Sequence, residues 1–119
     1  DQRLHYVFQE GKAVFKFAVV KMAEVAASLM EKNNISADDL KLFVPHQANL
    51  RITQMVQKKL GLKDEQIFSN IHKYGNTTAA SIPIALAEAV NEGKVSRGDL
   101  VVFASFGSGF TWASAVMKW

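Results

Sequence analysis

The hydrophobic pattern begins with a long apolar stretch, residues 13–30, which predicts a helix. Few polar side chains interrupt it, and at about 100° per residue they fall within roughly 140° of arc. These polar positions are Lys16, Lys21, Glu24 and Ser28. We therefore expect a mostly buried helix over 12–32 that ends at Asn33-Asn34, with one narrow polar stripe, rather than a membrane-spanning helix.

The rest of the chain alternates between strand and helix signals. Strands are predicted at 40–44, closed by Pro45, at 99–105 and at 110–119, with a turn over 106–109. Segment 64–70 is short and ambiguous. The weak alternation of Leu4, Tyr6 and Phe8 fits either an extended segment or a frayed start.

Helix signals are clearest where a capping residue adjoins a periodic segment. A second helix is predicted over 49–60, with Asn49 as N-cap and Gly61 as C-cap. A third is predicted over 78–91, which requires Pro83 to lie in its first turn or to kink it. The other predicted boundaries are a capped turn at 36–39, a turn at Tyr74-Gly75-Asn76 and a helix end at Gly93.

The order of elements, α-β-α-(β)-α-β-β, is typical of a layered α/β fold with helices packed on a mixed sheet. The last two strands are expected to form an antiparallel hairpin. With 119 residues, 49% of them hydrophobic and 21% charged, the chain suits a single domain over 1–119 with a buried core. No basic segment leads into an apolar one at the start, so we expect no targeting segment there.

Charge and cysteine content exclude several classes of function. The balance of 14 Lys+Arg against 11 Asp+Glu gives a formal net charge of only +3, too weak a bias to argue for nucleic-acid binding. The chain has no cysteine, which excludes a disulfide framework, a thiolate metal site and a cysteine nucleophile within it. The histidines, His5, His46 and His72, have no metal-like spacing and no acidic cluster, so we expect no metal site.

The most informative stretch is the predicted strand-to-helix junction at 44–49, Val-Pro-His-Gln-Ala-Asn. Ligands of open α/β sheets bind beyond the carboxyl ends of the strands, and His46 lies just past such an end. Its side chain could point into a crevice, or it could be a structural histidine bonded to a loop carbonyl. The stretch alone favours neither interpretation.

Two other stretches carry weaker signals. Asn76 follows a glycine and precedes a helix of small residues, which allows close approach of a ligand, although an ordinary capped turn explains it better. Gly107 and Gly109 could let backbone N–H groups face a developing oxyanion, but a plain hairpin turn is the stronger explanation when the stretch is taken alone.

Basic side chains gather on the second predicted helix. Arg51 and Lys58 are seven residues apart and so share one face, with Lys59 beside them. This arrangement is either a solvated face or a docking patch for an acidic partner.

Taken in order, three motifs resemble those of the 3-oxoacyl-acyl-carrier-protein synthase III family, the initiating condensing enzymes of bacterial fatty acid synthesis. They are Pro-His-Gln-Ala-Asn-Leu-Arg at 45–51, Tyr-Gly-Asn-Thr-Thr-Ala-Ala-Ser at 74–81 and Phe-Gly-Ser-Gly-Phe-Thr-Trp at 106–112. The resemblance runs from about Glu10 to Trp119 and covers the C-terminal part of the family, whose members are longer and carry a catalytic cysteine in their N-terminal half. It implies the C-terminal half of a thiolase-like fold, with that cysteine-bearing half absent from this chain.

The resemblance also implies roles for residues at matching positions. His46 and Asn76 would donate hydrogen bonds to the malonyl thioester oxygen and stabilise the enolate formed on decarboxylation. The backbone N–H of Ser108, where the family commonly has glycine, would serve a second oxyanion hole, and Phe106 would line the acyl pocket. Carrier-protein contacts would come from Gln47, Ala48, Asn49, Leu50, Arg51, Lys58 and Lys59.

The implied function is that of an acyltransferase that joins an acyl-CoA starter to malonyl-acyl carrier protein to begin fatty acid biosynthesis. Its partners would be acyl carrier protein, acyl-CoA and the N-terminal half of the same enzyme. The enzyme would be a cytoplasmic homodimer that binds no nucleic acid, membrane or metal. It would use no cofactor beyond the coenzyme A thioester, which is its substrate. The chain alone lacks the nucleophile and is expected to be inactive. The alternatives are a related thiolase-like acyltransferase, a quinolone-type synthase, or a non-catalytic carrier-protein-binding module.

Overall fold

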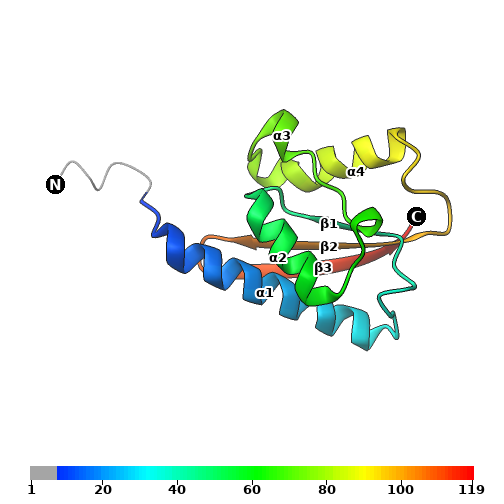
Figure 1. Ribbon diagram of the computed structural model, residues 1–119, viewed down its shortest axis with the longest axis horizontal. Coiled ribbons are helices and arrows are strands. Elements are labelled where there is room, and N and C mark those ends of the chain that lie inside the picture. Colours follow the sequence, from blue (N-terminus) through cyan, green and yellow to red (C-terminus); the bar gives the residue numbers. More distant parts are fainter. Residues whose placement is uncertain (1–7) are drawn as a thin grey trace.

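A computed structural model describes residues 8–119 and shows helices packed on a short sheet (Figure 1). Along the chain run α1 (Gly11–Lys32), β1 (Leu42–Pro45), α2 (Leu50–Leu60), α3 (Ile71–Tyr74), α4 (Ser81–Asn91), β2 (Leu100–Gly107) and β3 (Thr111–Lys118). Two 3₁₀ turns, Asp64–Gln66 and Thr78–Ala80, precede α3 and α4. The ambiguous segment 64–70 contributes one parallel bridge, between Ile67 and Phe43, instead of a strand. The alternation noted at Leu4 and Tyr6 lies outside the described residues.

The three strands form one mixed sheet in the order β1-β2-β3. β1 runs parallel to β2, with Leu42 opposite Val101. β2 and β3 form the antiparallel hairpin that the sequence predicts, with Phe106 opposite Trp112. Every strand end differs from its predicted position by one or two residues, because hydrogen-bonded pairing with the neighbouring strand decides where each strand begins and ends.

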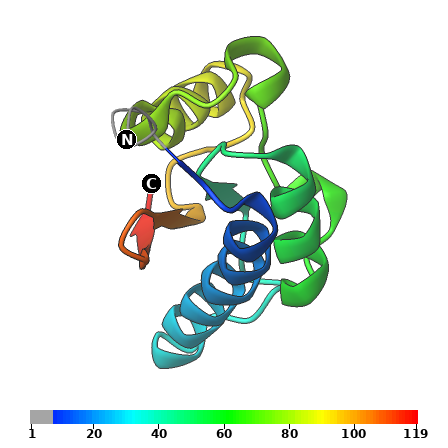
Figure 2. The same cartoon turned by 90° about the vertical axis from the view of Figure 1, so that its left-hand side faces the viewer.

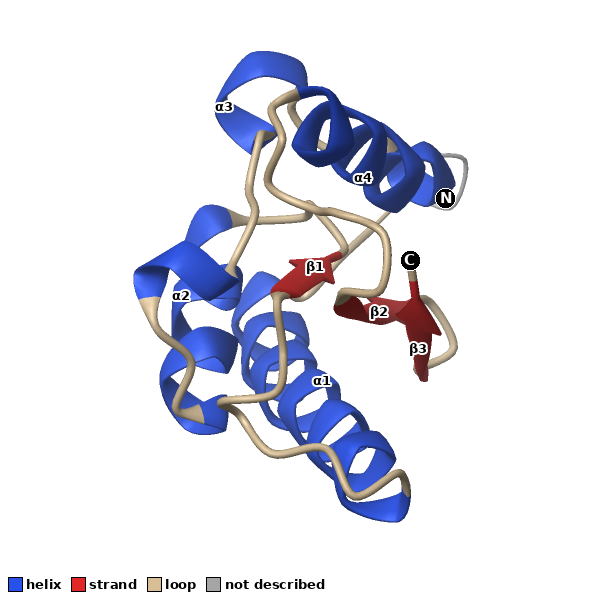
Figure 3. Cartoon of the chain, turned by 90° about the vertical axis from the view of Figure 1, so that its right-hand side faces the viewer, coloured by secondary structure: helices blue, strands red, loops and turns tan. Residues whose placement is uncertain are grey.

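Helices cover both faces of the sheet (Figures 2 and 3). Successive side chains of a strand point to opposite faces, so Phe43 packs with α1 and α2, whereas Leu42 and Val44 pack with α4. The same alternation sends Val102 toward α1 and Val101 toward α4. This explains why β1 reads as a continuous apolar run: it is buried on both faces.

Helix α1 is less buried than its sequence predicts. Its bounds match the predicted 12–32 within one residue, but its buried residues occupy one face only. They are Ala18, Val19, Met22, Ala23, Ala26 and Met30. Apolar side chains also lie on the opposite face, where Phe17 is 47% exposed and its ring lies 5.4 Å from that of Phe110. The expectation of a mostly buried helix is therefore wrong within residues 8–119, because the described elements cover one face of α1.

The caps predicted for α2 are confirmed. Asn49 Oδ1 accepts the backbone N–H of Arg51 at 2.9 Å, and Gly61 adopts a left-handed conformation with φ of 66°. In α4, Pro83 is the third residue, within the first turn as predicted, where a backbone N–H is not needed. Helix α3 was not predicted; the turn expected at 74–76 follows its end. Across residues 8–119, no helix is both long and apolar enough to span a membrane.

Candidate active site

His46 lies directly after β1 and is fixed on two sides. Its backbone N–H donates to Ala104 O at 2.8 Å and continues the ladder to β2. Its imidazole Nδ1 lies 2.6 Å from Ser81 Oγ, at the start of α4. Burial lowers the pKa of the His46 imidazole below its ordinary value, because desolvation disfavours the charged ring. The imidazole at the carboxyl end of β1 therefore stays neutral to a lower pH than a free histidine would, and Nε2 is its second ring nitrogen.

Asn76 lies on the loop that follows α3, and its side-chain amide is oriented by the backbone. Its Oδ1 accepts the N–H of Thr78 at 2.9 Å, which leaves Nδ2 as the donor end of the amide. Thr78 has a φ of 52°, in the left-handed region that β-branched residues rarely adopt. The loop therefore holds backbone strain next to Asn76.

Glu88 of α4 anchors α3, from which this loop starts. It accepts a hydrogen bond from Asn70 Nδ2 at 2.8 Å, from Lys73 Nζ at 2.6 Å and from Tyr74 OH at 3.4 Å. The hydrogen bond from Lys73, with that from Asn70, holds the pKa of Glu88 below its usual value, and Glu88 in turn raises the pKa of Lys73. The loop that carries Asn76 thus begins at a fixed point.

The three motifs found in the sequence meet at one cleft of about 800 Å³. His46 and Asn76 line it together with Phe106 and Ser108. Apolar residues of α1 and α2 complete its wall; among them are Ala13, Val14, Ala18, Met22 and Ile52. The sequence analysis did not predict that these residues line the cleft, although the apolar residues at the start of the first helix could have indicated it.

The tip of the β2–β3 hairpin forms one rim of the cleft. Gly109 has a φ of 141°, and a Cβ built there would lie 2.8 Å from Thr111 Cγ2, so only glycine fits. Ser108 is not among the described non-glycine residues with positive φ, so its backbone does not require glycine. Phe106 is 8% exposed and lies opposite Trp112, next to the turn of the hairpin.

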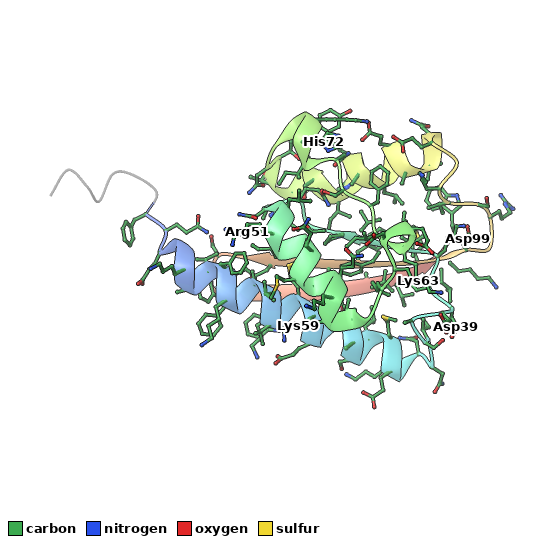
Figure 4. The ribbon with its side chains drawn as sticks, viewed as in Figure 1. Asp39, Arg51, Lys59, Lys63, His72 and Asp99 are labelled. Carbon is green, nitrogen blue, oxygen red and sulfur yellow. The ribbon has the colours of Figure 1, made fainter. Side chains whose placement is uncertain are left out.

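Arg51 and Lys59 lie on the outer surface of α2 (Figure 4). Arg51, Lys58 and Lys59 are exposed. The Arg51 guanidinium carbon lies 6.0 Å from the ring centroid of Phe15, within cation–π range. Since the next residue, Ile52, lines the cleft, Arg51 lies beside the cleft wall.

Gln47 and Ala48 do not belong to that outer surface. The Gln47 side chain is 1% exposed: its Nε2 donates to Pro45 O at 2.7 Å, and its Oε1 accepts from Ser69 Oγ at 2.8 Å and from the Asn70 N–H at 3.2 Å. The expectation that Gln47 contacts a carrier protein is therefore wrong, because its amide braces the end of β1 against the loop at 68–70. Ala48 lines the cleft.

The expected carrier-binding residues Asn49 and Leu50 are exposed, beside Arg51. Among the histidines, His72 is exposed on α3, and His5 lies outside the described residues. Within residues 8–119, no three His, Asp or Glu side chains gather as a metal site would require.

The matching family model and the curated relatives name the same family. Residues 30–119 match the family model described as 3-oxoacyl-[acyl-carrier-protein (ACP)] synthase III C terminal. The chain is 48% identical over 119 residues to the beta-ketoacyl-[acyl-carrier-protein] synthase III of Chlorobium phaeobacteroides. This match covers 100% of the chain but 36% of that protein. The chain thus spans about a third of the length of the relatives it matches.

Solved structures show the same fold. The synthase III of Thermus thermophilus superposes with a TM-score of 0.91 at 48% identity, over 94% of this chain and 35% of that one. The synthase III of Aquifex aeolicus gives a TM-score of 0.93 at 46% identity, over 96% and 37%. The predicted fold class, helices on a mixed sheet in the C-terminal part of a thiolase-like fold, is confirmed.

Proposed function

Because this chain belongs to the 3-oxoacyl-[acyl-carrier-protein] synthase III family, as its C-terminal domain, we propose that it forms the enolate-stabilising part of a decarboxylating condensing enzyme. The complete enzyme would join an acyl-CoA starter to malonyl-acyl carrier protein and so begin fatty acid synthesis. The observation that carries this proposal is the single cleft shared by His46 and Asn76. A cysteine in the N-terminal part of the protein would hold the acyl group, since this chain contains none.

In the proposed reaction, the cysteine first takes the acyl group from acyl-CoA, and coenzyme A leaves as the thiol. The next step is decarboxylation of the malonyl thioester. The bond to the carboxylate breaks, carbon dioxide leaves, and the electron pair moves onto the thioester oxygen as an enolate. His46 and Asn76 would donate hydrogen bonds to this oxygen. Loss of one such preorganised donor typically costs about 3 kcal/mol of transition-state stabilisation.

The last step proposed is carbon–carbon bond formation. The enolate carbon attacks the carbonyl carbon of the acyl-cysteine and forms a tetrahedral oxyanion. This intermediate then collapses, the carbonyl re-forms, and the cysteine thiolate leaves. The backbone N–H of Ser108 would stabilise the oxyanion of this step, beside that of the cysteine. Phe106 would border the acyl pocket, since it lies next to the turn of the hairpin and lines the cleft.

The outer surface of α2 is proposed as the docking site for acyl carrier protein. Arg51, Lys58 and Lys59 are exposed, and Arg51 adjoins the cleft wall, so an acidic partner bound there would lie close to the cleft. Local charge steers such an encounter even though the net charge is only +3. The proposed enzyme is a cytoplasmic homodimer and needs no metal or cofactor besides its thioester substrates.

The decisive experiment separates decarboxylation from acylation in the complete enzyme. His46→Ala and Asn76→Ala should each slow release of labelled carbon dioxide from malonyl-carrier protein by about 10²- to 10³-fold. Labelling of the cysteine by radioactive acetyl-CoA should fall less. The matched controls are His72→Ala and Asn91→Ala, which alter exposed residues outside the cleft.

One result would refute the assigned roles: cysteine labelling abolished while decarboxylation continues at the wild-type rate. A pull-down of the chain with acyl carrier protein tests the non-catalytic alternative. If the chain binds carrier protein, and adding the cysteine-bearing part with acyl-CoA and malonyl-carrier protein gives no condensation, the chain is a binding module only.

A further inference from the structure

The Ser81 hydroxyl lies behind His46, on the side away from Nε2. Ser81 is the first residue of α4 and is 2% exposed. Its Oγ lies 2.6 Å from His46 Nδ1, and it also accepts the backbone N–H of Gln47 at 3.2 Å. Ser81 does not cap its own helix, because the N-cap position is Ala80. The hydroxyl therefore faces the His46–Gln47 junction.

The direction of the Ser81–His46 hydrogen bond follows from counting protons. The Gln47 N–H can only donate, so it takes one acceptor site on Ser81 Oγ. The hydroxyl has a single proton, and within residues 8–119 its one acceptor is His46 Nδ1. If Nδ1 carried a hydrogen, two donors would point at Oγ, and the hydroxyl proton would be buried without an acceptor at a cost of about 1–3 kcal/mol. Nδ1 must therefore be the acceptor, and the ring proton resides on Nε2.

We propose that Ser81 is a positioning residue that fixes His46 in the tautomer with hydrogen on Nε2, the form that can donate to a thioester oxygen. This inference rests on the function proposed above. In the other tautomer, Nε2 would present a lone pair to the enolate oxygen and repel it. Ser81 acts through His46 and does not itself touch the substrate.

The first test replaces the hydroxyl in the complete enzyme. Ser81→Ala should lower decarboxylation of malonyl-carrier protein by about 10- to 100-fold, the loss typical when a group that orients a metal-ligating histidine is removed. Ser96→Ala is the matched control, since Ser96 is exposed and lies outside the cleft, and it should leave the rate unchanged.

The second test shows whether Ser81 acts through His46. In a His46→Ala background, adding Ser81→Ala should not slow decarboxylation further, because the group that Ser81 orients is already absent. A general structural role would slow the double variant by as much as it slows the single Ser81→Ala variant. That outcome would overturn the inference.

The third test needs no substitution at Ser81 and so does not depend on how that variant folds. In the unaltered enzyme with ¹⁵N-labelled histidine, NMR should show His46 Nε2 protonated and Nδ1 unprotonated, the signals being assigned by their loss in His46→Ala. The reverse pattern, or a wild-type rate for Ser81→Ala, refutes this inference alone. A wild-type rate for His46→Ala refutes the proposed function as well.

Discussion

Replacing Gln47 by leucine tests whether a buried amide holds the end of β1 in place. Leucine is similar in size but makes no hydrogen bond, so Pro45 O and the Asn70 N–H lose this partner in a buried place. Phe68 O loses a longer bond of 3.4 Å from Gln47 Nε2, and only the two shorter bonds are counted. Each buried polar group left unpaired costs about 1–3 kcal/mol, so we expect a loss of about 2–6 kcal/mol in the free energy of unfolding. Ser69 Oγ is only partly buried and can turn to water.

Gln47→Glu gives a sharper result, because its effect depends on pH. A protonated carboxyl can replace both functions of the amide, accepting from the Asn70 N–H and donating to Pro45 O. An ionised carboxylate would face the Pro45 carbonyl oxygen and would also be desolvated. Both effects disfavour the charged form, so the pKa of the introduced carboxyl rises above its unfolded value of about 4.3. The folded state then binds more protons than the unfolded state, and the stability of this variant falls as pH rises through that range.

Urea denaturation of the complete enzyme, followed by circular dichroism at about pH 5 and pH 8, measures both effects. Hydrogen exchange at the Asn70 amide reports the local change, since that N–H donates to Gln47 Oε1. Gln54→Leu is the control: Gln54 is exposed, and its loss should change stability by no more than about 0.5 kcal/mol. Equal stabilities of Gln47→Leu and Gln54→Leu would refute the role of the brace.

Further predictions concern charge, backbone strain and protonation. Arg51→Glu should weaken carrier-protein binding and leave acyl-CoA priming nearly unchanged, with Lys94→Glu as control; equal loss of both activities would contradict a docking role. Thr78→Gly should be more stable to urea than Thr77→Gly by about 1 kcal/mol, because Thr78 has a φ of 52° and Thr77 one of −94°; the opposite ranking would contradict the strain. Because the pKa of His46 is lowered in the folded state, its contribution to stability is present above about pH 6.5 and is lost as pH falls toward the folded pKa. The difference in unfolding free energy between wild type and His46→Ala should therefore shrink on acidification. An increase in that difference would contradict the lowered pKa.

Much of the fold could be predicted because its signals are local. The caps Asn49 and Gly61 act within one turn of α2, and the β2–β3 hairpin joins segments that are adjacent in sequence. Helix α3 could not be predicted, since it spans only Ile71–Tyr74 and its anchor is Glu88, 14 to 18 residues away. Tertiary contacts of this kind leave no periodic pattern.

The candidate site also combines features that the sequence could predict with features that it could not. His46 and Asn76 could be singled out from their motifs, because both follow recognisable junctions. The burial of Gln47 could not, since its partners lie at 68–70, and a glutamine after a strand is more often exposed. Ser81 lay within a recognised motif, but its role depends on the proximity of α4 to β1, which only the structure shows.

The stretch 76–81 couples the two proposed donors. It contains Asn76 itself and Ser81, which bonds His46 across a separation of 35 positions. One short piece of backbone thus carries both Asn76 and the partner of His46, so a shift of this stretch would move both donors. The two donors lie thirty positions apart in the sequence, yet their alignment depends on one segment of six residues.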